Sequence, residues 1–179
     1  MPSPIAHAVS GYVLARGLDP PKNHNLRPLA FYAVFVAIAA DFDFIPQIIA
    51  GLATHRGFTH SFIFAIAFSL TLSRLVNSWV VIEYIRLFAL TLIIYGSHLV
   101  LDFFTQGGSG IPLLWPMSNQ TFQSAIPLFP AVHHSHGLFD SIHLLFLSFE
   151  LTYTIVLLWG LSQWKTSKHK RKKKISNYE

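Results

Sequence analysis

The chain has 179 residues, of which 52% are hydrophobic and 12% are charged, and it has a formal net charge of +5. Soluble domains carry about 25% charged residues, so this composition excludes an ordinary soluble domain and is typical of a membrane protein. The sequence contains no cysteine and ten histidines, which excludes disulfides and thiolate metal sites. A bound metal would need His, Asp and Glu ligands, a set that favours zinc or a similar divalent ion.

We expect an all-α, polytopic membrane bundle with about four transmembrane helices and a short N-terminal helix. The short helix is predicted over Ile5–Arg16, because Gly17 and the following "DPP" end it. A spanning helix needs about 20 mostly apolar residues. Four segments approach this length: Pro28–Ile45, Phe58–Val81, Ile85–Phe104 and Ile142–Trp164. We predict one membrane domain over residues 1–164 and a basic cytoplasmic tail over residues 165–179.

Basic residues are unevenly distributed between the two sides of the predicted bundle. If the spans alternate, one side carries Lys22, Arg27, Arg74, Arg86 and the basic tail, whereas the other carries Arg56 alone. The positive-inside rule places the first side in the cytoplasm. We therefore predict a multi-pass protein of the inner membrane with a cytoplasmic C-terminus. A basic segment after an apolar helix favours membrane lipids over nucleic acid as its partner.

Ionisable residues recur at the outward ends of the predicted spans. Asp41 and Asp43 lie late in the first span, His60 opens the second, and His98 and Asp102 lie late in the third. Such residues are costly within a membrane and are candidates for function. His98 and Asp102 are i and i+4, so both point the same way on a helix and form a good pair of metal ligands.

The two aspartates of "AADFDFIP" are two residues apart, so an ideal helix would point them in different directions. Pro46 follows shortly afterwards and suggests that the helix breaks there. One aspartate would then ligate a metal, while the other bridges a second metal or holds a ligand histidine.

The stretch "THRGFTHSF" (54–62) carries two histidines and an arginine directly before an apolar run. We predict His60 as the ligand, because it opens a span where the other ends arrive. A turn at Gly57 would let His55 converge with it as an orienting group or a further ligand. Arg56 suits an anionic substrate, especially a phosphate. The predicted catalytic groups are accordingly Asp43, His55 and Arg56.

A second cluster lies in "HHSHGLFDSIH" (133–143). His136, Asp140 and His143 are i, i+4 and i+7, and would share one face if the last helix begins early. Glu150 extends this stripe. The cluster is a candidate second metal site, and the alternative is a solvated junction between loop and helix.

The order of the motifs "AH", "DFDFIP", "HRGFTHSF", "SHLVLDFFT" and "GIPLLWP" resembles the YdjM-like family over about residues 5–116. That family is described as LexA-regulated inner-membrane proteins with an inferred metal-dependent hydrolase activity. More distantly, the pattern is similar to the helical zinc-dependent phospholipase C and nuclease superfamily. By motif order, the resemblance implies metal ligands at His7, at Asp41 or Asp43, at His60, and at His98 with Asp102. His136 and Asp140 are compatible with a second His-x-x-x-acid pair of that superfamily.

These observations together predict metal-assisted hydrolysis at the outward face of the membrane. The expected substrate is a small or lipid-linked anionic molecule, and the position of the site suggests a lipid or a lipid-linked phosphoester. Two alternatives stay open. Intramembrane Asp and His residues also suit a proton- or metal-conducting transporter, and a closed set of ligands suits a non-catalytic protein with a structural metal.

Overall fold

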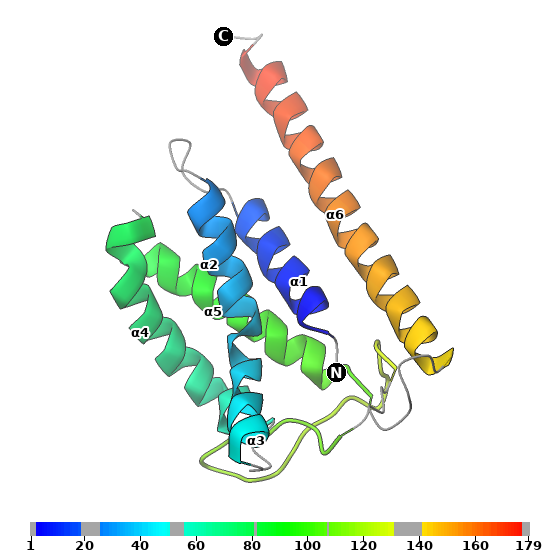
Figure 1. The fold of residues 1–179 in the computed structure, drawn as a ribbon. Coiled ribbons are helices and arrows are strands. Elements are labelled where there is room, and N and C mark those ends of the chain that lie inside the picture. The colour runs from blue at the N-terminus through cyan, green and yellow to red at the C-terminus, as the bar shows by residue number, and fades with distance from the viewer. Residues whose placement is uncertain are drawn as a thin grey trace.

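The computed structural model describes residues 3–18, 26–50, 56–80, 82–106, 108–130 and 141–176 (Figure 1). Its helices are α1 (Pro4–Gly17), α2 (Leu26–Ile38), α3 (Phe44–Ala50), α4 (Phe62–Val80), α5 (Tyr84–Phe103) and α6 (Ser141–Ser176). Two 3₁₀ turns, η1 (Ala39–Asp43) and η2 (Phe58–His60), lie between them. The described residues form no β-strand, so the predicted all-α class is confirmed.

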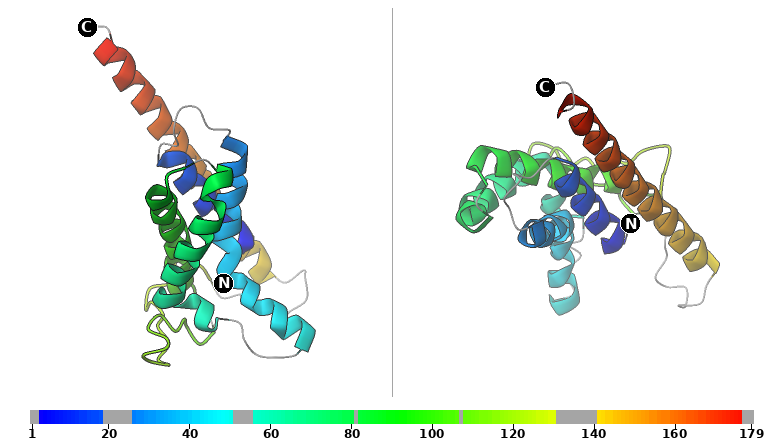
Figure 2. Two further views of the ribbon diagram at one scale, coloured as in Figure 1. Left: turned by 90° about the vertical axis from the view of Figure 1, so that its left-hand side faces the viewer. Right: turned by 90° about the horizontal axis from the view of Figure 1, so that it is seen from above.

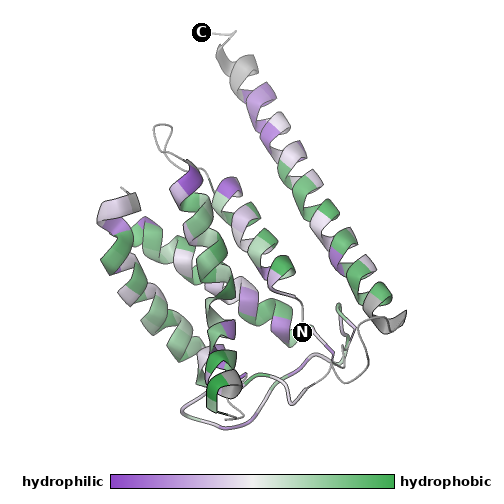
Figure 3. Cartoon of the chain, in the orientation of Figure 1, coloured by the Kyte–Doolittle hydropathy of each residue, from purple (hydrophilic) through white to green (hydrophobic). Residues whose placement is uncertain are grey.

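Four stretches of the described chain are long and apolar enough to cross a membrane. They are Arg27–Pro46, Phe62–Trp79, Tyr84–Phe103 and Leu144–Arg171. Large apolar side chains lie on the outer surface, among them Phe31 and Trp79, which are 78% and 82% exposed. Figure 3 shows that hydrophobic residues predominate along these helices. Such exposure is unfavourable in water and is expected for side chains that face lipid.

The spans alternate in direction, so that the end of α2, the start of α4 and the end of α5 lie at one end of the molecule (Figure 1). Helix α1 starts at this same end and packs against α2, α5 and α6. Helix α6 lies at the side of the bundle and packs mainly against α1 (Figure 2). The polar ends that the sequence predicted to meet are therefore neighbours.

Helix α1 approaches α2 closely at a glycine. A Cβ atom on Gly11 would lie 2.6 Å from the carbonyl oxygen of Ala33 and 2.6 Å from the Cβ of Ala37. Small residues allow backbones to approach in this way within membranes. The contact places the first turns of α1 beside the end of α2.

Two details differ from the sequence-based expectation. The first span breaks at η1, before Pro46. Pro46 instead lies in the first turn of α3, where its missing N–H costs no helical hydrogen bond. Helix α6 continues past Trp164 to Ser176. Its 36 residues correspond to about 54 Å, which exceeds the roughly 30 Å hydrocarbon core of a bilayer. The basic residues at 165–174 thus extend the last helix.

Candidate metal site

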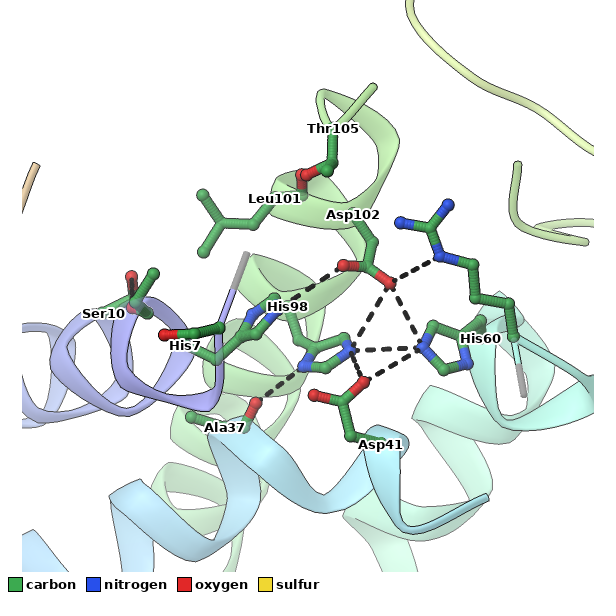
Figure 4. Close-up of polar contacts among 12 residues, drawn as sticks. His7, Ser10, Ala37, Asp41, His60, His98, Leu101, Asp102 and Thr105 are labelled. Carbon is green, nitrogen blue, oxygen red and sulfur yellow. Dashed lines mark hydrogen bonds and ion pairs between the residues drawn. The ribbon is translucent and has the colours of Figure 1, made fainter. Parts of the chain in front are cut away.

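Four buried side chains converge where η1, η2 and the end of α5 meet (Figure 4). Asp41, His60, His98 and Asp102 each offer one ligand atom, and these atoms all lie within 4.8 Å of one another. The four side chains are between 0% and 5% exposed. Groups this polar are seldom buried without a compensating partner, because each would cost several kcal/mol.

The main chain of α2 orients His98. Nδ1 of His98 donates to the carbonyl oxygen of Ala37 at 2.8 Å. This carbonyl is available because the α-helix ends at Ile38, and the last carbonyls of a helix lack partners within it. With the proton on Nδ1, the lone pair of Nε2 faces the cluster, as metal ligation requires.

Asp43 orients His60 in the same sense. Its Oδ2 lies 3.2 Å from Nδ1 of His60 and accepts hydrogen bonds from the hydroxyl of Thr59 at 2.7 Å and the N–H of Gly57 at 3.1 Å. Nε2 of His60 therefore faces the cluster. A carboxylate behind a ligand histidine fixes its ring and raises its basicity. Of the two roles predicted for the second aspartate, this geometry matches the holding of a histidine.

The same contacts affect the protonation of His60. Burial alone would lower the pKa of His60, but the neighbouring carboxylates of Asp102, Asp41 and Asp43 outweigh burial and raise the pKa to about 10. A raised pKa favours a proton on the ring of His60. Metal binding would release this proton, because a histidine ligates in its neutral form.

The distances suit one tetrahedral ion. Nε2 of His60 lies 3.3 Å from Nε2 of His98 and 3.3 Å from Oδ2 of Asp102. Nε2 of His98 lies 3.6 Å from Oδ1 of Asp41. Ligand bonds of about 2.0–2.1 Å in a tetrahedron around zinc place neighbouring ligand atoms about 3.3–3.4 Å apart. Two further pairs are longer, at 3.8 Å from Nε2 of His60 to Oδ1 of Asp41 and 3.9 Å from Nε2 of His98 to Oδ2 of Asp102. The ligand atoms would therefore have to move slightly inward to coordinate one such ion.

The charge of the cluster also fits a divalent cation. None of the four carboxylate oxygens of Asp41 and Asp102 has a hydrogen-bond partner of good geometry, although all are buried. With neutral histidines, the ionised carboxylates of Asp41, Asp43 and Asp102 give −3, and Arg56 offsets one charge to leave −2. An ion of charge +2 would neutralise the remainder.

Arg56 lies against the cluster from the loop before η2. Its Nε is 3.5 Å from Oδ2 of Asp102, and its side chain is buried. The backbone of Arg56 has φ 60°, a left-handed conformation that is unfavourable for a residue with a Cβ. The guanidinium also approaches Gly108, where an added Cβ would lie 3.2 Å from Nη1. The positively charged side chain of Arg56 is therefore held between Asp102 and the loop that follows α5.

His7 reaches the cluster from the other side. Its Nε2 lies 3.5 Å from Oδ1 of Asp102, and its ring stacks on His98 with 3.9 Å between centroids. The converging group does not include His7. His7 thus contacts Oδ1 of Asp102, whereas His60 contacts Oδ2 of the same carboxylate.

The structure brings some predicted site residues together and separates others. Asp41, His60, His98 and Asp102 converge, whereas Asp43 and His7 contact this group from outside, and Arg56 contacts Asp102. His55, His136 and Asp140 lie outside the described residues, as does the side chain of His143. Glu150 is engaged elsewhere, because the N–H and hydroxyl of Ser3 donate to its carboxylate.

Sequence reasoning missed two contributors to the site. The carbonyl of Ala37 orients His98, and the hydroxyl of Thr59 donates to Asp43. A backbone carbonyl has no sequence signal. The start of α4 is capped by the neighbouring Ser61, since its Oγ accepts from the N–H of Phe64 at 3.2 Å.

Comparison with known proteins identifies the family. The sequence profile of the YdjM inner membrane protein family matches residues 1–172. The chain belongs to this family. A relative is the inner membrane protein YbcI of Escherichia coli (strain K12), which is 31% identical over 130 residues, covering 68% of this chain and 72% of the relative. No solved structure matches the chain. Membership confirms the resemblance of the motifs, and the family's inner-membrane location agrees with the four candidate spans.

Proposed function

We propose that the protein is a metal-dependent hydrolase of the inner membrane that acts on a phosphoester. One observation carries this proposal, namely the convergence of Asp41, His60, His98 and Asp102 as buried ligand atoms. The two histidines present Nε2 to the cluster while other groups bind Nδ1. A set of histidines and carboxylates is typical of catalytic zinc, whereas structural zinc sites are mostly rich in cysteine.

A bound divalent ion would polarise a phosphoryl oxygen and lower the pKa of a water molecule. The residues of the chain supply the other requirements. Asp43 accepts the Nδ1 proton of His60 and keeps that ring in place. Arg56 provides a fixed positive charge beside Asp102, suited to an anionic oxygen. Burial of the cluster excludes bulk water and strengthens these electrostatic interactions.

The supported substrate is an anionic phosphoester, and a lipid-linked one fits best. The cluster lies at the end of three candidate spans, where the reacting group of a lipid would be found (Figure 1). Among the cluster and the ionisable residues that contact it, Asp41, Asp43 and Arg56 are the most exposed, at 5%, 8% and 8%. Access from this side would bring a substrate to Arg56 first.

A non-catalytic protein with a structural metal is the second candidate. Four protein ligands would complete a tetrahedral shell, whereas catalytic zinc keeps one position open for water or substrate. Burial of all four residues favours this candidate. A conducting role has less support, since the buried acidic residue of α6, Glu150, bonds to Ser3. The other buried acidic residues of the described spans lie at one end.

Turnover by the detergent-purified protein separates these functions. We expect hydrolysis of a chromogenic phosphodiester and of a phospholipid to stop after chelation and to return with zinc. Arg56→Gln should raise KM for the anionic substrate and leave the metal content unchanged. The cobalt-substituted protein should show an absorption spectrum that changes with pH, as an exchangeable water requires. Bound metal without turnover and with a pH-independent spectrum would favour the structural role.

A further inference from the structure

Glu150 is a buried acidic side chain that the proposed site does not use. It is 4% exposed and lies within the candidate span Leu144–Arg171. A carboxylate in such a position is costly unless it is well bonded. Both polar hydrogens of Ser3 satisfy it, since the backbone N–H donates to Oε1 and the hydroxyl donates to Oε2 at 2.7 Å.

Ser3 connects this carboxylate to the first turn of α1. It is the N-cap residue, and its Oγ accepts a hydrogen bond from the N–H of Ile5 at 3.1 Å. Its carbonyl accepts from the N–H groups of Ala6 at 3.0 Å and His7 at 3.4 Å. Glu150 therefore anchors the turn that carries His7.

His7 extends the connection to the metal site. Its Nε2 lies 3.5 Å from Oδ1 of Asp102, while Oδ2 of the same carboxylate lies 3.3 Å from Nε2 of His60. Helix α6 packs mainly against α1. A continuous set of contacts thus runs from Glu150 through Ser3 and His7 to Asp102.

We propose that Glu150 is a positioning residue, which fixes the first turn of α1 and so holds His7 against the ligand Asp102. This inference rests on the proposed metal site. It gives α6 a role in that site although none of its described side chains reaches the four ligand atoms. A second polar contact between the same helices, from Tyr153 OH to Ser10 Oγ at 2.7 Å, keeps α6 beside α1 when Glu150 is changed.

The test compares Glu150→Leu with Glu150→Gln. Leucine is more favourable in a membrane span, so it does not impair insertion, whereas glutamine still offers an oxygen acceptor to Ser3. We expect Glu150→Leu to weaken zinc affinity about 10–100-fold, the usual effect of removing a group that orients a ligand. The zinc affinity of Glu150→Gln should stay close to that of the unchanged protein. Thr152→Val is the control, because the hydroxyl of Thr152 bonds only within α6.

A double mutant with His7→Ala shows whether Glu150 acts through His7. We expect Glu150→Leu to have little further effect on zinc affinity in the His7→Ala background, since coupled residues are not additive. If the two substitutions reduced zinc affinity independently, so that their fold-changes multiplied in the double mutant, the proposal would be overturned. It would also be overturned if Glu150→Leu left zinc affinity unchanged. A Glu150→Gln variant as impaired as Glu150→Leu would also contradict it, because the acid itself would then be required.

A metal-independent measurement separates this inference from the proposed function. The chain has no cysteine, so Ala6→Cys provides a single thiol at a buried position of α1. We expect Glu150→Leu to increase labelling of this thiol and Glu150→Gln to leave it protected. Unchanged labelling would reject the anchoring role. If the wild-type protein bound zinc but hydrolysed no substrate, only the proposed hydrolase activity would be rejected.

Discussion

Asp43 and the carbonyl of Ala37 determine which nitrogen of each cluster histidine faces the other ligands. Asp43 Oδ2 lies 3.2 Å from Nδ1 of His60, and the Ala37 carbonyl accepts from Nδ1 of His98. The two Nε2 atoms are thereby directed at one point, 3.3 Å apart. Orientation of this kind needs contacts outside the ligand set, and it is as specific to a metal site as the ligands themselves.

The first prediction concerns Asp43→Asn. An amide in this position offers His60 a weaker acceptor and no charge, so we expect zinc affinity to fall about 10–100-fold with the ligand set intact. Competition with a chromophoric chelator measures this affinity. Glu83→Gln is the matched control, since Glu83 forms an exposed pair with Arg86 away from the cluster. A loss of all bound zinc in Asp43→Asn would instead make Asp43 a ligand.

Part of the site was predictable from residue spacing. His98 and Asp102 are one helical turn apart, so their shared face follows from the helix geometry alone. The separation of Asp41 from Asp43 and a difference in their roles were also expected, but which aspartate takes which role was not, because this depends on where η1 places each side chain. The carbonyl of Ala37 was not predictable, since every residue has one.

At the scale of the elements, α1 and the break after α2 position the site. The α-helix of the first span ends at Ile38 and gives way to η1, which carries Asp41 into the cluster. Helix α1 lies against this break because Gly11 allows it to approach Ala33 and Ala37. The packing that supports α1 therefore also supports the carbonyl that orients His98.

The second prediction concerns Gly11→Ala. The added Cβ would lie 2.6 Å from a backbone oxygen, so we expect a destabilisation of about 1–3 kcal/mol from overpacking. Zinc affinity should also fall, because α1 and α2 must separate beside Ala37, whose carbonyl orients His98. Thermal unfolding in detergent and chelator competition measure the two effects.

Gly96→Ala is the control for this substitution. Gly96 lies in α5, two residues from His98, and has nothing within 4 Å of an added Cβ. An alanine in a helix is more favourable than glycine by up to about 1 kcal/mol, so this variant should be as stable as the unchanged protein or more so. If Gly11→Ala were as stable and bound zinc as tightly as Gly96→Ala, close packing of α1 against α2 would not be needed for stability or for zinc binding.

The helices were more predictable than their interruptions. Long apolar runs located the four spans, and Gly17 with the following prolines located the end of α1. The break at η1 has no comparable signal, because "AADFD" contains neither glycine nor proline and contacts with distant residues decide its geometry. The end of α6 was not predicted because hydropathy marks only the apolar part of the helix. The helix continues beyond that part because Lys and Arg are good helix formers.

At the scale of the whole molecule, the two ends differ in charge. The end of α2, the start of α4 and the end of α5, which adjoin the cluster, lie at one end, whereas the end of α1, the start of α2, the end of α4 and the end of α6 lie at the other (Figure 1). These latter segments carry Arg16, Arg27, Arg74 and the basic residues of α6. Alternation of the spans produces this separation. By the positive-inside rule, we expect the basic end to face the cytoplasm and the cluster to face outward.

The third prediction is this orientation. Because the chain has no cysteine, single thiols introduced by Asn119→Cys and Ser167→Cys report the two ends without interference. In intact spheroplasts, a membrane-impermeant maleimide should label the cysteine at 119, while the cysteine at 167 should react only after permeabilisation. The reverse pattern would place the cluster in the cytoplasm.

Metal analysis of the detergent-purified protein tests the central claim most directly. We expect about one zinc or more per wild-type chain, and a loss of the zinc shared by the cluster in both His60→Ala and His98→Ala. His169→Ala, which changes an exposed histidine of α6, should keep the wild-type content. A wild-type protein without stoichiometric metal, or cluster variants that retain the full amount, would contradict the account.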